Sequence, residues 1–454
     1  MRDWFYEHLY IFYTFIIILS IINYFWVQDW LNYIIGVLAI PMLIVSFYTA
    51  TKLFKILGTA FILVGFSMYI YVGLPLYNIP LFLTSNMSLL GFLIVLPWIN
   101  TVVHVGRYDK QINRLMVENV EDLGALYVKS TITTYILMMF LNLSAVILSQ
   151  DVLQKNMKHM SKTVRDVFIS KTTIRAFALA LIWSPMEVIV AITIEATGVN
   201  YLRLLPWLIL VSVLTLSIDI IVGRQRFKSI PFNHQSRNSN ISLIGILRKI
   251  IQLFIALVLF LTTILIVSNL FNLNFIITVT LVIIPFSIIW AFLIKKMQSF
   301  KLLGYKLWKR QTNNMQNFIV LFTTLAFFSN SLNATPFLEV VQKPFMLFTE
   351  NPLVVFLFIM LTYFFMALLG IHPIGVTGVL VEVLAPIFTI FNPLSIAIVL
   401  IVSALATSGS SSYGVAVTLT AMNTHQNPYK ITLRNLIFTF TFGFIGIFVA
   451  MLIL

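Results

Sequence analysis

The fold is decided by the stretch LSIAIVLIVSALATSGSSSYGVAVTLTA, residues 394–421, in which a long apolar run is broken in its middle. The break reads Ala406-Thr-Ser-Gly-Ser-Ser-Ser-Tyr-Gly414, and seven of its nine residues are Thr, Ser or Gly, which have low helix propensity. The run is long enough to cross a bilayer, which takes about 20 apolar residues. Because unpaired backbone at membrane depth must be satisfied by protein or by a water-filled cavity, the stretch predicts a transmembrane helix that is unwound at mid-depth.

A second apolar segment, residues 173–198, carries a comparable break. Ser184-Pro185 lies near its middle, where proline removes a backbone donor and clashes with the preceding turn. The alternative interpretation of both breaks is a kink combined with small-residue helix packing. Interruptions at corresponding places in two halves of a membrane protein are, however, typical of secondary transporters.

The composition of the whole chain is that of a polytopic membrane protein. Of its 454 residues, 60% are hydrophobic and 10% are charged, whereas soluble domains average about 45–50% apolar and about 25% charged residues. This composition excludes a soluble enzyme, a disordered chain and a nucleic-acid reader. The chain has no cysteine and no P-loop, which excludes disulfides, thiolate metal sites and ATP hydrolysis by the P-loop route. We expect no enzymatic activity, no nucleic-acid partner and no cofactor apart from Na⁺ as a coupling ion.

The basic residues predict the topology, because the cytoplasmic loops of membrane proteins collect Lys and Arg. The chain has 29 Lys and Arg against 15 Asp and Glu. With a cytoplasmic N-terminus, a re-entrant hairpin at 129–150 and an oppositely directed hairpin at 352–390, only Arg203 and Lys343 fall on the outer side. Complete spans in place of either hairpin would move several basic loops outward. The charges therefore predict a multi-pass protein of the cytoplasmic membrane with two opposed hairpins.

The spans and loops divide the chain into six regions. These are N-terminal scaffold helices at 1–104, a cytoplasmic-surface amphipathic helix at 105–128, a first repeat at 129–222, a basic cytoplasmic loop at 223–249, further scaffold helices at 250–345 that end in one span at 317–345, and a second repeat at 346–454. Each repeat has a hairpin, a broken helix and a final span in the same order. We expect an all-α polytopic membrane protein, namely an inverted-repeat secondary transporter with two re-entrant hairpins and two unwound transmembrane helices.

Polar residues at the breaks and hairpin tips are the candidate ligands, since unwound carbonyls coordinate cations and half-helix N-termini attract anions. The candidates for substrate or ion binding are Asn142, Ser144, Ser184, Pro185, Glu187, His372, Thr377, Thr407, Ser408, Gly409, Ser410 and Ser411. Glu187 follows the first break by one turn and is expected to bind a coupling cation or carry a proton.

Several of these residues also fit a purely structural role. Asn142 and Ser144 also fit hydrogen-bond glue between helices, and His372 also fits a cap on its hairpin turn. Asp219 lies near the inner end of its span and is predicted to pair at the rim with Arg224 and Arg226.

The sequence resembles the large membrane subunit of TRAP transporters and, more loosely, the ion transporter superfamily that includes dicarboxylate carriers. The resemblance covers about 130–454. It is carried by Phe177 to Gly198 and then, in order, by Leu369-Gly370, Ala385-Pro386-Ile387, Asn392-Pro393-Leu394, Thr407 to Gly414 and Arg434. It implies a bacterial protein with a rigid scaffold and a moving transport domain, and substrate and Na⁺ sites between hairpin tips and breaks. Carried over, Na⁺ falls at Ser184, Thr407 and Ser408. The resemblance also implies a homodimer.

The function that these features predict is secondary active transport of a small anionic solute by elevator-like alternating access, coupled to Na⁺ or H⁺. A TRAP system also needs a binding protein and a small membrane subunit, whereas a stand-alone carrier needs only this chain and the lipid bilayer. Two other functions stay open. One is export or flipping of a lipid-linked or amphipathic substrate, which the bulky hairpin sequence Phe140-Leu-Asn-Leu-Ser-Ala145 would suit. The other is a non-transporting membrane sensor or scaffold.

Overall fold

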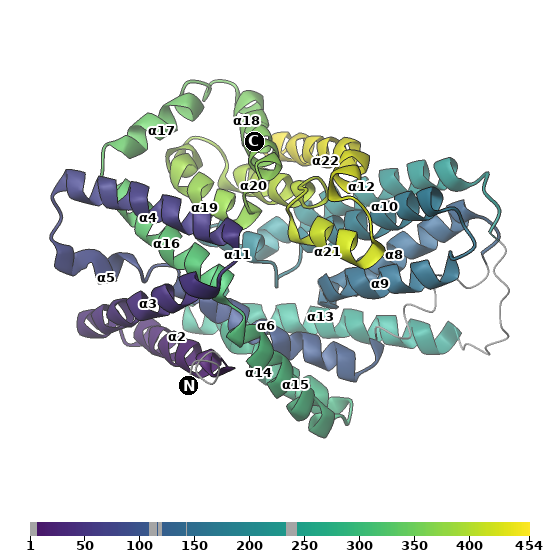
Figure 1. Ribbon diagram of the computed structural model, residues 1–454, viewed down its shortest axis with the longest axis horizontal. Coiled ribbons are helices and arrows are strands. Elements are labelled where there is room, and N and C mark those ends of the chain that lie inside the picture. The colour runs from purple at the N-terminus through teal and green to yellow at the C-terminus, as the bar shows by residue number, and fades with distance from the viewer. Residues whose placement is uncertain (1–6, 109–115, 117–119, 142, 233–242) are drawn as a thin grey trace. The chain divides into compact units, whose positions relative to one another are not determined.

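A computed structural model describes residues 7–108, 116, 120–141, 143–232 and 243–454. Within them the secondary structure is helical, apart from one isolated bridge between Asp122 and Pro231 (Figure 1). The chain forms two compact units. Unit 1 comprises Met1–Val102, Thr263–Glu350 and Ile374–Ile387, and unit 2 comprises Val103–Thr262, Asn351–Pro373 and Phe388–Leu454.

Unit 1 is built from apolar helices around a buried central helix. Its elements are α2 (Leu9–Phe25), α3 (Asp29–Thr49), α4 (Lys52–Val72), η1 (Leu76–Asn78), α5 (Ile79–Phe82), most of α6 (Met87–Val105), α14 (Phe275–Leu293), α15 (Met297–Asn313), α16 (Gln316–Asn333), α17 (Phe337–Met346), nearly all of α19 (Pro373–Leu384) and the start of η3 (Ala385–Thr389). The central helix is α16, which contacts α3, α4 and α5. Its Phe327 packs against Tyr69 of α4 with ring centroids 5.9 Å apart.

Two features of this region differ from a simple row of straight apolar spans. The single span expected at 317–345 is divided into α16 and α17, which are bent by 88°. The bend falls before Pro336, and a proline disfavours helical backbone in the residue that precedes it. The basic segment after α14 is also helical, because α15 buries an apolar face, with the rings of Trp308 and Tyr10 5.5 Å apart and nearly perpendicular. The sequence of α15 is rich in basic residues and contains no long apolar run.

Unit 2 contains both predicted breaks. Its elements are α8 (Leu123–Leu141), α9 (Leu143–Asn156), α10 (Lys162–Leu181), α11 (Val188–Thr197), α12 (Tyr201–Phe227), α18 (Pro352–Leu368), α20 (Pro393–Ala406), η4 (Thr407–Gly409), α21 (Val415–Thr424) and α22 (Pro428–Met451), and α13 (Leu243–Phe271) passes from unit 2 into unit 1. The breaks separate α10 from α11 and α20 from α21, at the residues that the sequence predicts.

Unit 2 repeats itself at a constant residue shift. The helices α11 and α21 both have ten residues, and they begin at Val188 and Val415, so the shift is 415 − 188 = 227. Each is followed by a residue in the left-handed region, Gly198 (φ 65°) or His425 (φ 53°). Each next helix is then capped by an asparagine whose side chain accepts a backbone N–H, at Asn200 for α12 and at Asn427 for α22. The same local structure therefore occurs in both halves of unit 2.

The left-handed position after each ten-residue helix gives a paired test. Gly198→Ala is expected to lower the free energy of unfolding by about 1 kcal/mol, because a β-carbon is strained at positive φ. His425→Gly is expected to raise it by up to about 1 kcal/mol, since the same strain is already present there. Denaturant unfolding of the purified protein measures both changes. Equal and small effects at the two positions would contradict the structural equivalence.

The other predictions about organisation concern the two hairpins and the amphipathic helix. The chain turns between α8 and α9 at the predicted hairpin tip, and these arms contact each other but are longer than the 129–150 hairpin (Figure 1). Ten of the 24 residues of the predicted amphipathic helix at 105–128, namely 109–115 and 117–119, lie outside the described residues, and α8 begins within the segment at Leu123. The arms predicted for the second hairpin fall into different units, α18 in unit 2 and α19 in unit 1. By length and composition, seven helices of the described chain could cross a membrane, or eight if the bent α16–α17 pair is one span.

Candidate functional site

The first break, residues 182–187, is held open by side chains from the neighbouring helices. The last carbonyls of a helix have no intrahelical partner, and that of Leu179 in the last turn of α10 accepts the Ser212 hydroxyl at 2.8 Å. The Trp183 indole N–H donates to the Tyr135 hydroxyl at 2.8 Å, and the Tyr201 hydroxyl donates to the Trp183 carbonyl. The break is thus a fixed feature, because α12 supplies hydroxyl donors for its free backbone carbonyls and α8 supplies an acceptor for the Trp183 indole.

Three predicted site residues lie in this first break. Ser184 and Pro185 are buried, and Ser184 accepts the backbone N–H of Met186 at 3.3 Å. Glu187 is buried too, and it is the N-cap residue of α11. A carboxyl and a serine hydroxyl therefore stand within one short unwound segment, which offers oxygen ligands to a hard cation.

The second break, residues 407–414, has the same construction. The Ala406 carbonyl at the end of α20 accepts the Thr439 hydroxyl of α22 at 3.0 Å. This bond spans 33 residues, as does the bond from Ser212 to Leu179. At the shift of 227 residues, Thr439 corresponds to Ser212 and Ala406 to Leu179. In both halves, therefore, a hydroxyl on the final helix satisfies a carbonyl that the break sets free.

Most hydroxyls of the second break are used to brace it. Thr407 donates to the Ala404 carbonyl at 2.7 Å, Ser410 to the Thr407 carbonyl at 3.4 Å, and Ser411 to the Ala367 carbonyl of α18 at 3.1 Å. Ser408 has no hydrogen-bond partner among the described residues and is half-buried. The oxygens that remain for a ligand are accordingly the Ser408 hydroxyl and backbone carbonyls of the segment.

Close packing places the second break against α10 and α18. A β-carbon added to Gly409 would lie 3.0 Å from Cγ2 of Ile174 on α10. A β-carbon added to Gly370, which has φ 85° and follows α18, would lie 3.0 Å from the Tyr413 ring. His372 belongs to the same connection after α18, in unit 2, whereas Thr377 belongs to unit 1. The structure thus brings the turn after α18 to the second break.

The tip of the α8–α9 hairpin lies level with the second break. Gln150 of α9 donates to Thr420 of α21 at 2.8 Å, and Gln154 donates to the Asn423 carbonyl at 3.0 Å, so the two helices run in the same direction. Ser144 precedes Gln150 by six residues, and Gly414 precedes Thr420 by six. At a helical rise of about 1.5 Å per residue, both lie about 9 Å back along their helices. Ser144 is exposed there, and Asn142 lies outside the described residues.

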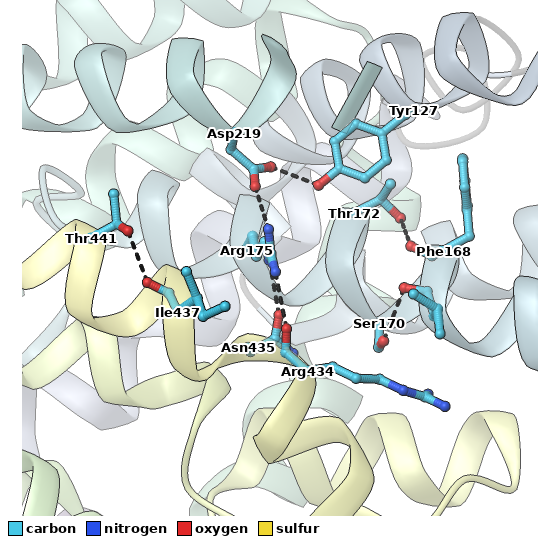
Figure 2. A network of polar contacts seen from close by, with 11 residues as sticks. Tyr127, Phe168, Ser170, Thr172, Arg175, Asp219, Arg434, Asn435, Ile437 and Thr441 are labelled. Carbon is cyan, nitrogen blue, oxygen red and sulfur yellow. Dashed lines mark hydrogen bonds and ion pairs between the residues drawn. The ribbon is translucent and has the colours of Figure 1, made fainter. Parts of the chain in front are cut away.

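A buried charge network was not predicted. Arg175 of α10 forms an ion pair with Oδ1 of Asp219 on α12 at 2.6 Å, and the Tyr127 hydroxyl donates to Oδ2 at 2.8 Å (Figure 2). Arg175 also donates to the Asn435 side chain at 2.9 Å and to the Arg434 carbonyl at 3.1 Å. The expected rim pairing of Asp219 with Arg224 and Arg226 is therefore wrong. Asp219 is buried, and its partner, Arg175, precedes it by 44 residues and lies on a different helix.

The network lies next to the second break. The Asn435 side chain accepts a hydrogen bond from Arg175. Its β-carbon would lie 3.5 Å from a β-carbon added to Gly409. The guanidinium also covers the Phe438 ring at 5.0 Å. Tyr127, Arg175, Asp219 and Asn435 thus join four helices, α8, α10, α12 and α22 (Figure 2), and of these α10 and α22 also contact η4.

Comparison with known proteins identifies the fold. No family model and no curated protein matches the sequence. Among solved structures, the chain is similar to the crystal structure of the YdaH transporter of Alcanivorax borkumensis, with a TM-score of 0.62, 12% sequence identity, and coverage of 88% of this chain and 98% of that chain. The likeness is to a transporter and not to an enzyme. It does not single out the TRAP family, which stays a prediction. The chain therefore has the fold of a polytopic, all-α membrane transporter.

Proposed function

We propose that this protein is a secondary active transporter that moves a small anionic solute across the bacterial cytoplasmic membrane by elevator-like alternating access, coupled to Na⁺ or H⁺. The observation that carries the proposal is the pair of breaks in unit 2, each braced by a hydroxyl 33 residues further along the chain. Maintaining unwound backbone in lipid is expensive, so a construction that appears twice indicates a binding function.

The two breaks differ in charge, which suggests a division of roles. The first break holds the buried carboxyl of Glu187 beside Ser184, and this combination suits a coupling cation or a proton. The second break contains no acid, and α21 begins there at Val415, with Gly414 as an N-cap residue that supplies no side-chain cap. Its free N–H groups and helix dipole favour a negatively charged group of the substrate. Thr407 and Ser408 add carbonyl and hydroxyl oxygens for a second cation.

In this proposal unit 2 carries the solute and unit 1 serves as the fixed scaffold. Both breaks and their braces belong to unit 2, so the site can move as one body without being rebuilt. The YdaH structure supports the fold on which this mechanism depends.

The triple variant Ser408→Ala, Ser410→Ala, Ser411→Ala tests the proposal. Purified protein in liposomes is offered radiolabelled phosphate, succinate and citrate under an imposed Na⁺ or H⁺ gradient. Wild-type protein is expected to take up one of these anions, and the triple variant to lose at least about tenfold of that uptake. Loss of the Ser408 hydroxyl removes a ligand to a charged group, and loss of the Ser410 and Ser411 hydroxyls removes two bonds that brace the break.

A matched control separates site effects from effects on the helix. Ser395→Ala with Ser403→Ala removes two buried hydroxyls of α20 that have no partner among the described residues, and uptake is expected to persist. Unchanged uptake in the triple variant would show that the site is elsewhere. Absence of gradient-driven uptake of every anion by wild-type protein would contradict the transport function itself.

A further inference from the structure

The middle of α10 carries two buried cationic residues one turn apart. Lys171 is 8% exposed and Arg175 is 7% exposed, and residues four apart on a helix lie on the same face. Burial of a charge is costly unless the charge is paired, so the Arg175 guanidinium requires an anionic partner, and an anion would also stabilise the partly buried ammonium of Lys171. The two residues differ in whether they have one.

Arg175 has its partners, and they are fully used. Its guanidinium binds Asp219, Asn435 and the Arg434 carbonyl. The two carboxylate oxygens of Asp219 are occupied by Arg175 and by the Tyr127 hydroxyl. This carboxylate is therefore neutralised before Lys171 is considered.

Lys171 has no hydrogen-bond or ion-pair partner among the described residues. The charged groups around it can be placed from the contacts of its helix. Arg175 lies one turn further along α10, and its guanidinium binds the carbonyl of Arg434 and the carboxylate of Asp219. Arg226 lies two turns after Asp219 on α12. The one carboxylate of α10 itself, Asp166, already lies in the field of Lys162, Arg165 and Arg434. The cluster thus has an uncompensated positive charge around a lysine that is more than nine-tenths buried.

A second unpartnered donor lies beside Arg434. The Gln426 side chain accepts from Arg434 through Oε1 at 2.9 Å, and its buried Nε2 has no partner in the described part of the chain. The free groups are an ammonium and an amide N–H₂, which are donors only. The missing partner must therefore supply acceptor oxygens and negative charge.

The internal repeat shows that the fold does not need charges here. At the shift of 227 residues, Lys171 corresponds to Ile398 and Arg175 to Val402, and both are fully buried apolar side chains. Asp219 corresponds to Gly446, where an added β-carbon would lie 2.6 Å from Val402. Apolar packing thus does in the second half what charges do in the first. Because an apolar replacement is often neutral or stabilising, the charged version calls for a reason other than packing.

We propose that Lys171, together with Arg226 and Arg434, forms a binding site for a small multivalent oxyanion, either a phosphate or a dicarboxylate, at the cytoplasmic end of unit 2. This proposal rests on the proposed transport function and extends it, since it adds a binding site for the anionic substrate on the cytoplasmic side. Free anions and anionic lipid headgroups offer the same oxygens, so the experiment must separate these two sources.

The test is a direct binding measurement on the full-length protein in nanodiscs of neutral phosphatidylcholine, with titration of inorganic phosphate and of succinate. Wild-type protein is expected to bind one of them saturably. Lys171→Met keeps the length of the side chain and removes its charge, and it is expected to weaken binding by about tenfold or more, which is typical for the loss of a charge-assisted hydrogen bond. Lys171→Arg is expected to retain binding within about threefold.

Stability without ligand supplies a second readout. Lys171→Met is expected to unfold at a higher temperature than wild type in anion-free buffer, because an unpaired buried charge has been removed. The matched control is Lys162→Met, an exposed lysine at the start of the same helix, which is expected to change neither binding nor stability.

Three results would overturn the inference. The first is wild-type protein that binds neither anion, and the second is Lys171→Met protein that binds as tightly as wild type. The third is Lys171-dependent binding of phosphatidylglycerol, when this lipid is included in the nanodisc, without binding of either free anion. Uptake is not the readout. Lys171-dependent anion binding by a protein that transports nothing would support the site while contradicting the transport proposal.

Discussion

Asp219→Ala is expected to lower the free energy of unfolding by about 3–5 kcal/mol, which is the usual cost of removing one partner of a buried ion pair. Arg175 would keep its charge in a buried position, and the Tyr127 hydroxyl would lose its acceptor. The bonds from Arg175 to Asn435 and to the Arg434 carbonyl would not compensate for a lost counter-charge. Chemical denaturation of the purified protein, followed by tryptophan fluorescence, measures the change.

The double variant Arg175→Met, Asp219→Ala identifies the cause. It is expected to be more stable than Asp219→Ala alone, because no unpaired charge stays buried. The second half of unit 2 is a natural precedent, since Val402 and Gly446 occupy the corresponding positions. A double variant at least as unstable as Asp219→Ala would show that the lost side-chain volume, and not the unpaired charge, destabilises the protein.

The apolar helices could be predicted from the sequence because lipid and protein interior both select continuous apolar runs. The apolar run Leu9–Phe25, for example, forms α2 over its whole length. The failures occur where another principle decides. α15 is rich in lysine and forms because its apolar stripe packs on α2, and the bend at Pro336 depends on one residue within an otherwise continuous apolar run.

The candidate site could be predicted only in part, for a comparable reason. Both breaks were predicted correctly, because Ser184-Pro185 and the Thr407–Ser412 run disfavour helix through local backbone chemistry. The Arg175–Asp219 pair was missed, because it depends on a tertiary contact and because α10 begins at Lys162, well before the predicted start of that span at 173. The shift of 227 residues was a usable signal. It aligns Arg175 with an apolar residue and so marks it as buried.

Gly223→Ala is expected to destabilise the protein by about 3 kcal/mol or more, through overpacking and the loss of a hydrogen bond to a charged group. An added β-carbon would lie 2.0 Å from the ring of Tyr127. That ring is fully buried, stacked on Phe227 at 5.5 Å and edge-on to Phe168 at 5.8 Å, so it has no room to withdraw. Its displacement would also break the bond to Asp219. Denaturant unfolding measures the loss of stability.

A background variant and a second glycine show whether the ring is the obstacle. In protein that already carries Tyr127→Leu, adding Gly223→Ala is expected to cost less than about 1 kcal/mol, because the clash is with a side chain that is gone. Gly124→Ala should behave differently, since its β-carbon would lie 2.6 Å from the backbone oxygen of Arg224. Backbone cannot be removed by substitution, so Gly124→Ala is expected to stay destabilising in both backgrounds. Equal rescue of both glycine variants by Tyr127→Leu would contradict this account, because it would mean that α8 and α12 can separate freely.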